Sequence, residues 1–149
     1  MDLFHSTPFA TYALFAAGLC VLLISIDSLG GGARARSKTT PNAEDTSTVS
    51  KGATVVAEEP EQVARVMRAH RNALANVVPF LIVMFLYVAL GASRQWVLGL
   101  CGVFSVMRVT HAVVYIMGIQ PWRTLAFIVA QTCTGIAVVQ VVRAALAIG

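Results

Sequence analysis

Four long apolar runs dominate this chain and leave too little polar surface for a water-soluble fold. They lie at about residues 8–27, 62–91, 95–117 and 122–148. Each is at least as long as the ~20 residues that an α-helix needs to cross a bilayer. Only 12% of the 149 residues are charged, about half of the ~25% usual in soluble domains. The sequence therefore predicts one all-α membrane domain over residues 1–149, built as a four-helix bundle.

The limits of the spans follow from local signals. The first five residues contain no Lys or Arg, and the first run is longer than the core of a signal peptide. We therefore interpret it as a retained span, closed by Asp27 and the glycines at 30–32. Acidic residues and Pro60 predict that the second helix begins near residues 58–61.

The segment at about 28–60 differs from the rest of the chain in composition. It contains glycine, serine, threonine and charges of both signs, and it separates the first two spans. A loop of this length in so small a protein is expected to be either disordered or functional.

The basic residues are distributed unevenly between the two ends of the predicted bundle. Four spans place the long loop and the connection at 118–121 at one end, with eight Lys and Arg, and leave two at the other end. The positive-inside rule then assigns the long loop to the cytoplasm. Membrane orientation accounts for the net charge of +4, so nucleic acid is not an expected partner. The three cysteines lie inside apolar runs and are expected to be buried hydrophobes rather than metal ligands or disulfides.

Several polar side chains fall inside the spans, where an ionisable group requires a partner or a water-filled site. Arg108, His111 and Tyr115 share one face of the third span by their spacing of three and four. A second stripe follows the second helix, and further polar groups begin the fourth span: Arg65, Arg68, Arg71, Asn72, Asn76, Arg123, Thr124 and Gln131. Any one of these residues alone is explained by ion pairing, interhelical hydrogen bonding or anchoring at the interface. Together they form a surplus of positive charge with no acidic residue among them, which predicts an anionic ligand.

Two motifs carry a resemblance to a known family. The sequences Arg-Ala-His-Arg-Asn at 68–72 and Arg-Val-Thr-His-Ala-Val-Val-Tyr at 108–115 resemble those of the membrane-associated proteins in eicosanoid and glutathione metabolism, the MAPEG family. Within the family, the chain is most similar to the branch of microsomal glutathione transferase 1 and microsomal prostaglandin E synthase 1. The resemblance covers most of the chain.

The resemblance implies a homotrimer that binds glutathione between neighbouring subunits on the cytoplasmic side. The positions that match the glutathione contacts of the family are Arg34, Arg71, Asn72, His111, Tyr115 and Arg123. Arg123 matches the arginine that stabilises the thiolate, Thr124 is placed to add a hydrogen bond to the same sulfur, and Asp45 matches an aspartate proposed to assist. A solvated loop aspartate is the alternative interpretation of Asp45. A cation beside a thiol increases the nucleophilic thiolate fraction, which agrees with the role given to Arg123.

Two positions depart from the family pattern. Ala75 stands where the family has a glutamate of the polar network around the tripeptide, and Phe127 stands where the prostaglandin synthase has tyrosine. Loss of the glutamate is expected to weaken glutathione binding or to change the preferred thiol. Both departures make prostaglandin chemistry a less favoured expectation than glutathione use. His70 belongs to the motif but points about 100° away from Arg71 around the helix, so packing is its expected use.

These observations predict a membrane-bound glutathione S-transferase or peroxidase that acts on lipophilic electrophiles or lipid hydroperoxides. A non-catalytic lipid-binding member and a prostaglandin-E-synthase-like isomerase remain as alternatives. A small four-span transporter is a further alternative function, which the sequence disfavours. Coupling to protons needs an acidic residue within a span, and Asp27 is expected at a helix end. The protein is expected to contact membrane lipids in a bacterial inner membrane or the endoplasmic reticulum, in multi-pass form.

Overall fold

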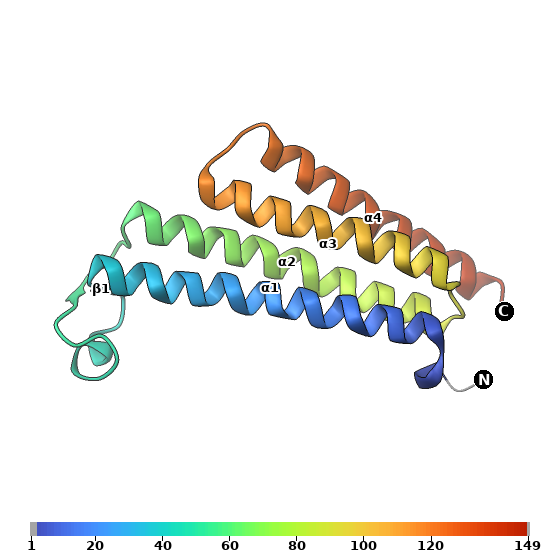
Figure 1. Ribbon diagram of the computed structural model, residues 1–149, viewed down its shortest axis with the longest axis horizontal. Helices are drawn as coiled ribbons and strands as arrows, with labels where there is room; N and C mark the ends of the chain where they lie inside the picture. The colour runs from blue at the N-terminus through green and yellow to red at the C-terminus, as the bar shows by residue number, and fades with distance from the viewer. Residues whose placement is uncertain (1–2, 149) are drawn as a thin grey trace.

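The computed structural model describes residues 3–148 and shows an elongated bundle of four long helices (Figure 1). Residues 1, 2 and 149 of the predicted domain lie outside the described residues. The long helices are α1 (Thr7–Ser37), α2 (Glu61–Ala89), α3 (Arg94–Met117) and α4 (Trp122–Leu146). The shorter elements are two 3₁₀ helices and two strands: η1 (Leu3–His5), β1 (Thr39–Thr40), η2 (Ala43–Ser47) and β2 (Thr54–Val55). All four α-helices are long and apolar enough to cross a membrane, and the predicted all-α bundle is confirmed.

The ends of the helices follow capping chemistry. Ser6 and Ser93 precede α1 and α3, and each side-chain oxygen accepts a hydrogen bond from a backbone N–H of the first turn, as N-cap residues do. Pro60 and Pro121 precede α2 and α4. Gly118 ends α3 in the left-handed region, with φ at 74°. Helices α2, α3 and α4 therefore begin and end within a few residues of the predicted limits.

The core lies between the helices: α1 and α4 each pack against α2 and α3, and α2 also packs against α3. At its centre the rings of Phe80 on α2 and Phe104 on α3 are stacked, with centroids 3.6 Å apart. The Tyr12 hydroxyl of α1 donates to the carbonyl of Leu81 on α2 at 3.1 Å. Cys101 and Cys133 are buried as predicted, but Cys20 is exposed on α1.

The predicted end of the first helix was wrong. Helix α1 continues through Asp27 and the glycines at 30–32 as far as Ser37. Its length has a physical reason, because Gly30 and Ala33 are buried and a Cβ added to Gly30 would lie only 2.7 Å from the sulfur of Met67 on α2. The glycine therefore allows the two helices to approach closely instead of breaking α1. Asp27 lies within the helix, about 30 Å along it from Thr7 at 1.5 Å per residue, which is the thickness of the hydrocarbon core.

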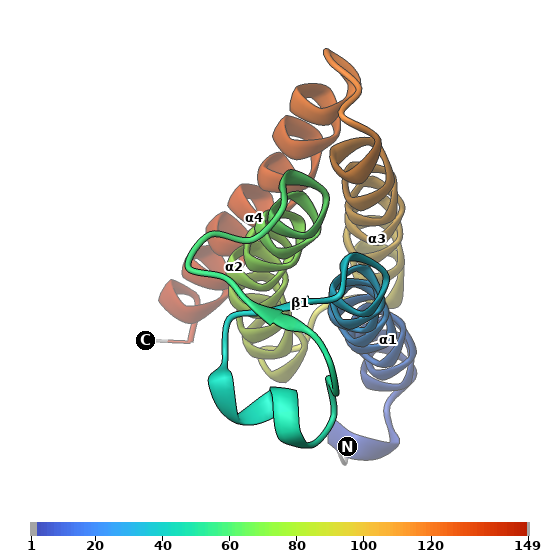
Figure 2. The same ribbon diagram turned by 90° about the vertical axis from the view of Figure 1, so that its left-hand side faces the viewer.

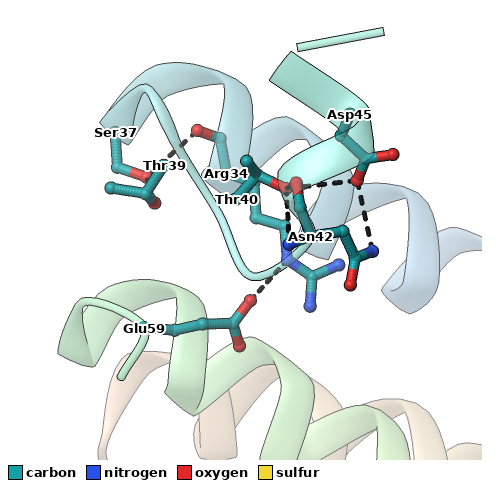
Figure 3. A network of polar contacts seen from close by, with 7 residues as sticks. All are labelled: Arg34, Ser37, Thr39, Thr40, Asn42, Asp45 and Glu59. Carbon is teal, nitrogen blue, oxygen red and sulfur yellow. Dashed lines mark hydrogen bonds and ion pairs between the residues drawn. The ribbon is translucent and has the colours of Figure 1, made fainter. Parts of the chain in front are cut away.

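The segment between α1 and α2 is shorter than predicted and is ordered. Strands β1 and β2 pair in parallel, Thr39 with Thr54 and Thr40 with Val55. The Thr40 side chain is buried, and Asp45 accepts from its hydroxyl at 3.1 Å and from the Asn42 amide at 3.2 Å. These contacts join the strand to η2 (Figure 3). The described structure therefore shows the loop in an ordered conformation.

The two ends of the bundle differ in what they carry. The ordered loop and the α3–α4 connection lie at one end, and the α2–α3 turn and both termini lie at the other (Figure 1). This alternation is the arrangement that the span count predicts. We call the end with the long loop the loop end and the other the termini end.

Replacing Gly118 with alanine is expected to destabilise the bundle by about 1–2 kcal/mol, the cost of a left-handed conformation for a residue with a Cβ. The new Cβ would also lie 2.6 Å from Nη1 of Arg65. Thermal unfolding in detergent measures the change. Gly99→Ala on α3 is the matched control, because its Cβ would meet nothing within 4 Å and alanine favours the helix. Equal melting temperatures for the two variants would contradict this account of the α3 terminus.

Candidate functional site

Arg108 is the most unusual side chain of the core. It lies on α3 with only 1% of its surface exposed, in a place where a charge is costly unless it is paired. Its Nη2 donates to the side-chain oxygen of Asn72 on α2 at 3.0 Å. Its Nε and Nη1 are buried and have no hydrogen-bond partner among the described residues. The structure therefore contains a buried cation with two unsatisfied donors.

Three aromatic or cationic groups continue from Arg108 toward the loop end. His111, one turn further along α3, is 3% exposed, and its ring lies 5.5 Å from that of Tyr115. The guanidinium carbon of Arg123, at the start of α4, lies 4.8 Å from the centre of the Tyr115 ring. This distance is within the range of a cation–π contact. We call Asn72, Arg108, His111, Tyr115 and Arg123 the polar cluster.

Gln120 was not predicted as a site residue, yet its side chain forms hydrogen bonds with Arg123 and Thr124, the two candidate catalytic residues of α4. With its side-chain oxygen facing Arg123, it accepts from Nη2 at 2.6 Å and from Nε at 3.1 Å. In the same orientation its nitrogen donates to the Thr124 hydroxyl at 3.1 Å. The spacings of three and four residues from Gln120 are the sequence signal that could have found this contact.

The loop residues of the predicted site do not join the polar cluster within one chain. Arg34 forms an ion pair with Glu59, and Asp45 is bound to Thr40 and Asn42 (Figure 3). Seen along the bundle, η2 and the α3–α4 connection lie at opposite edges of the molecule (Figure 2). Arg71 and Thr124 are exposed on α2 and α4. The fold thus unites Asn72, His111, Tyr115 and Arg123 of the predicted set.

The polar cluster contains no acidic residue. Among residues 3–148, the ion pairs with Glu59 and Glu61 are formed by Arg34, Arg65 and Arg68, which are not members of the cluster. Ala75, at the position of the absent family glutamate, is exposed on α2. Phe127 packs against His111, with ring centroids 6.1 Å apart. The arrangement is therefore suited to an anion that brings its own acceptors.

The comparison with known proteins agrees with this architecture. The model of the MAPEG family matches residues 11–143. The chain belongs to the MAPEG family. Members of this family are four-helix membrane bundles, and this MAPEG protein is an integral, multi-pass membrane protein. The resemblance inferred from the two motifs is confirmed.

Two kinds of relative resemble this MAPEG chain over most of their length. A human protein named prostaglandin E synthase is 33% identical over 135 residues, which cover 85% of this chain and 86% of the relative. A pig protein named microsomal glutathione S-transferase 1 is 31% identical over 129 residues, with 85% and 83% covered. Its rat counterpart is 34% identical over 124 residues, with 81% and 78% covered.

The contact between Asn72 and Arg108 is expected to stabilise the bundle. Asn72→Leu removes the acceptor and should lower stability by about 1 kcal/mol, the scale of a hydrogen bond inside a membrane bundle. Asn72→Asp keeps the shape and adds a countercharge, so it should raise stability. Unfolding in mixed micelles with increasing denaturing detergent measures both changes. A loss of stability in Asn72→Asp similar to that in Asn72→Leu would contradict the assignment of Arg108 as an unbalanced cation.

Proposed function

We propose that this MAPEG protein is a membrane-bound glutathione transferase that also acts as a peroxidase on lipid hydroperoxides. The observation that carries the proposal is the buried, unbalanced cation Arg108 beside His111, Tyr115 and Arg123. Relatives named microsomal glutathione S-transferase 1 support the same conclusion. The expected second substrate is a lipophilic electrophile that reaches the site from the bilayer.

The polar cluster fits the chemistry of an anionic tripeptide. Glutathione carries two carboxylates, and a carboxylate is the usual partner of an arginine fork. Two donors of Arg108 are unsatisfied in the described structure, so an acceptor from a ligand would remove the cost of burying them. Asn72, which already accepts from Arg108, would keep the fork oriented.

Arg123 is the residue that we assign to the reacting sulfur. When bound, glutathione supplies a thiol whose deprotonated form attacks an electrophile or a hydroperoxide. Arg123 places a positive charge at the start of α4, where it would stabilise negative charge on that sulfur. The Tyr115 ring and the Gln120 amide hold its guanidinium in one orientation, and pre-positioned charge of this kind is the main electrostatic contribution to catalysis. Thr124 would add its hydroxyl to the same sulfur.

A neighbouring subunit is proposed to complete the site in a homotrimer. Arg71 and Gln131 are exposed on the surfaces of α2 and α4, where lipid would leave their polar groups unsatisfied. Contact with another subunit removes this cost. Such contact would also give Arg34 and Asp45 of one chain access to Arg123 of the next.

The excess of basic residues at the loop end supports a cytoplasmic location for the long loop and the site. The water-soluble tripeptide would then enter from the cytoplasm, and the lipophilic substrate from the bilayer. The host membrane is a bacterial inner membrane or the endoplasmic reticulum.

An isomerase is the second candidate, favoured by the human relative named prostaglandin E synthase. The purified protein should be assayed with glutathione against 1-chloro-2,4-dinitrobenzene, a lipid hydroperoxide and a prostaglandin endoperoxide. Conjugation and hydroperoxide reduction are the expected activities. Turnover of the endoperoxide alone would support the isomerase instead. Binding of lipid without turnover or thiol binding would indicate a non-catalytic member.

Arg123→Ala should lower the rate of 1-chloro-2,4-dinitrobenzene conjugation by at least about 100-fold, the usual effect of removing one pre-positioned stabilising group. The oligomeric state should not change, as measured by size-exclusion chromatography with light scattering. Arg94→Ala is the control, because Arg94 lies at the termini end. Unchanged conjugation in an intact Arg123→Ala protein would refute the role of this arginine.

Asp45 is proposed to act mainly by ordering the loop, since it accepts from Thr40 and Asn42. Thr40→Val should then lower conjugation about fivefold or less, as expected for loss of one hydrogen bond of about 1 kcal/mol, and Asp45→Asn, whose amide oxygen still accepts from Thr40 and Asn42, should lower it no more than that. Steady-state kinetics compares the two variants. A much larger loss of kcat in Asp45→Asn alone would instead indicate that the carboxylate acts on the reacting groups.

A further inference from the structure

A groove runs along the outer surface between α3 and α4 in the half of the bundle near the termini end. It consists of two adjoining hollows of about 560 and 410 Å³ that share Trp96, Thr132 and Ile136. Most of its other lining is apolar, including Val103, Val129 and Val139. Two glycines, Gly99 and Gly135, also line it, and a Cβ added to either would meet nothing within 4 Å. The glycines therefore widen the space between the helices.

The outer end of this groove is polar and basic. Arg143 and Gln140 line it, and Arg143 Nη1 donates to the Gln140 side-chain oxygen at 3.4 Å, a long contact. The Gln140 amide in turn donates to the hydroxyl of the buried Tyr87 at 3.4 Å. None of the residues that line the groove in the described part of the chain is acidic. The charge at this end is thus complementary to an anion.

The groove extends from the membrane edge into the hydrocarbon core. From Val129, the innermost α4 residue of its lining, to Arg143 is fourteen residues, or about 21 Å of helix. This is more than half of the ~30 Å thickness of the hydrocarbon core, so the groove is long enough to follow an acyl chain of one leaflet. Trp96 is 49% exposed beside the outer end, and tryptophan and arginine are typical residues of the membrane–water interface. An acyl chain would lie along the apolar part while a headgroup reaches Arg143.

We propose that the α3–α4 groove is a binding site for a phospholipid with an anionic headgroup. One acyl chain packs between α3 and α4 over Gly135, and the phosphate accepts from Arg143 at the membrane edge. The site is separate from the polar cluster, since Arg143 lies twenty residues or about 30 Å along α4 from Arg123. The proposal does not depend on any catalytic activity of the protein.

Fluorescence quenching of Trp96 by brominated lipids tests this site. The full chain contains two tryptophans, so Trp122→Phe leaves Trp96 as the sole fluorophore. The protein is reconstituted into dioleoylphosphatidylcholine vesicles that contain increasing fractions of chain-brominated phosphatidylglycerol or, in parallel, chain-brominated phosphatidylcholine. Brominated phosphatidylglycerol should reach half-maximal quenching at about a fivefold lower mole fraction, the preference expected from one arginine near an anionic headgroup.

Two pairs of variants test separately the charge of Arg143 and the open space over Gly135. In Arg143→Gln, the two brominated lipids should reach half-maximal quenching at the same mole fraction. Arg94→Gln changes an arginine at the same end of the bundle but outside the groove lining, so it should retain the preference for phosphatidylglycerol. Gly135→Leu should fill the groove and weaken quenching by brominated phosphatidylglycerol. Gly18→Leu, on α1 with equal open space, should not.

Three results would overturn the proposal. The first is equal quenching by the two lipids in the Trp122→Phe protein, and the second is an unchanged preference in Arg143→Gln. The third is protection of Trp96 from both lipids, which would show that a second copy of the chain covers this face. None of these readouts uses glutathione or enzyme turnover, so failure of the lipid site and failure of the proposed reaction are distinguishable.

Discussion

Hydrocarbon offers the backbone no hydrogen-bond partner, and every other feature of this protein depends on that constraint. The chain satisfies its amides within four long helices, and small residues such as Gly30 allow two of them to pack closely. The same constraint makes a polar side chain inside the bundle costly. Arg108 is therefore informative, because it is nearly fully buried while two of its donors have no partner in the described structure.

The polar cluster and the proposed lipid groove use arginine in different surroundings. Arg108 is enclosed and oriented by Asn72, and Arg123 is oriented by Tyr115 and Gln120. This rigidity suits recognition of a small anion and stabilisation of charge during a reaction. Arg143, by contrast, lies at the end of an apolar groove and has a long contact to Gln140, which suits a headgroup that exchanges with the bilayer.

The loop end shows where prediction from sequence reached its limit. The second to fourth helices were predictable because hydropathy and Pro60 act locally. The end of α1 was not, since glycines at 30–32 ordinarily indicate a break, whereas here Gly30 lies against α2. For the same reason Asp27, which was expected at the end of a helix, lies inside one. The loop was recognisable as polar, but its order depends on Asp45, Thr40 and the pairing of two strands.

The sequence by itself determined that the protein resides in a membrane, and it determined the four spans, the family and the surplus of positive charge. Composition, periodicity and local motifs set these properties. The tertiary structure decided which charges meet. Packing of α2 against α3 brings Asn72 to Arg108, and the start of α4 brings Arg123 to Tyr115. It also left Arg34 and Asp45 in contacts of their own loop. Contacts between residues that are distant along the chain depend on how helices pack, and spacing within one helix carries no information about them.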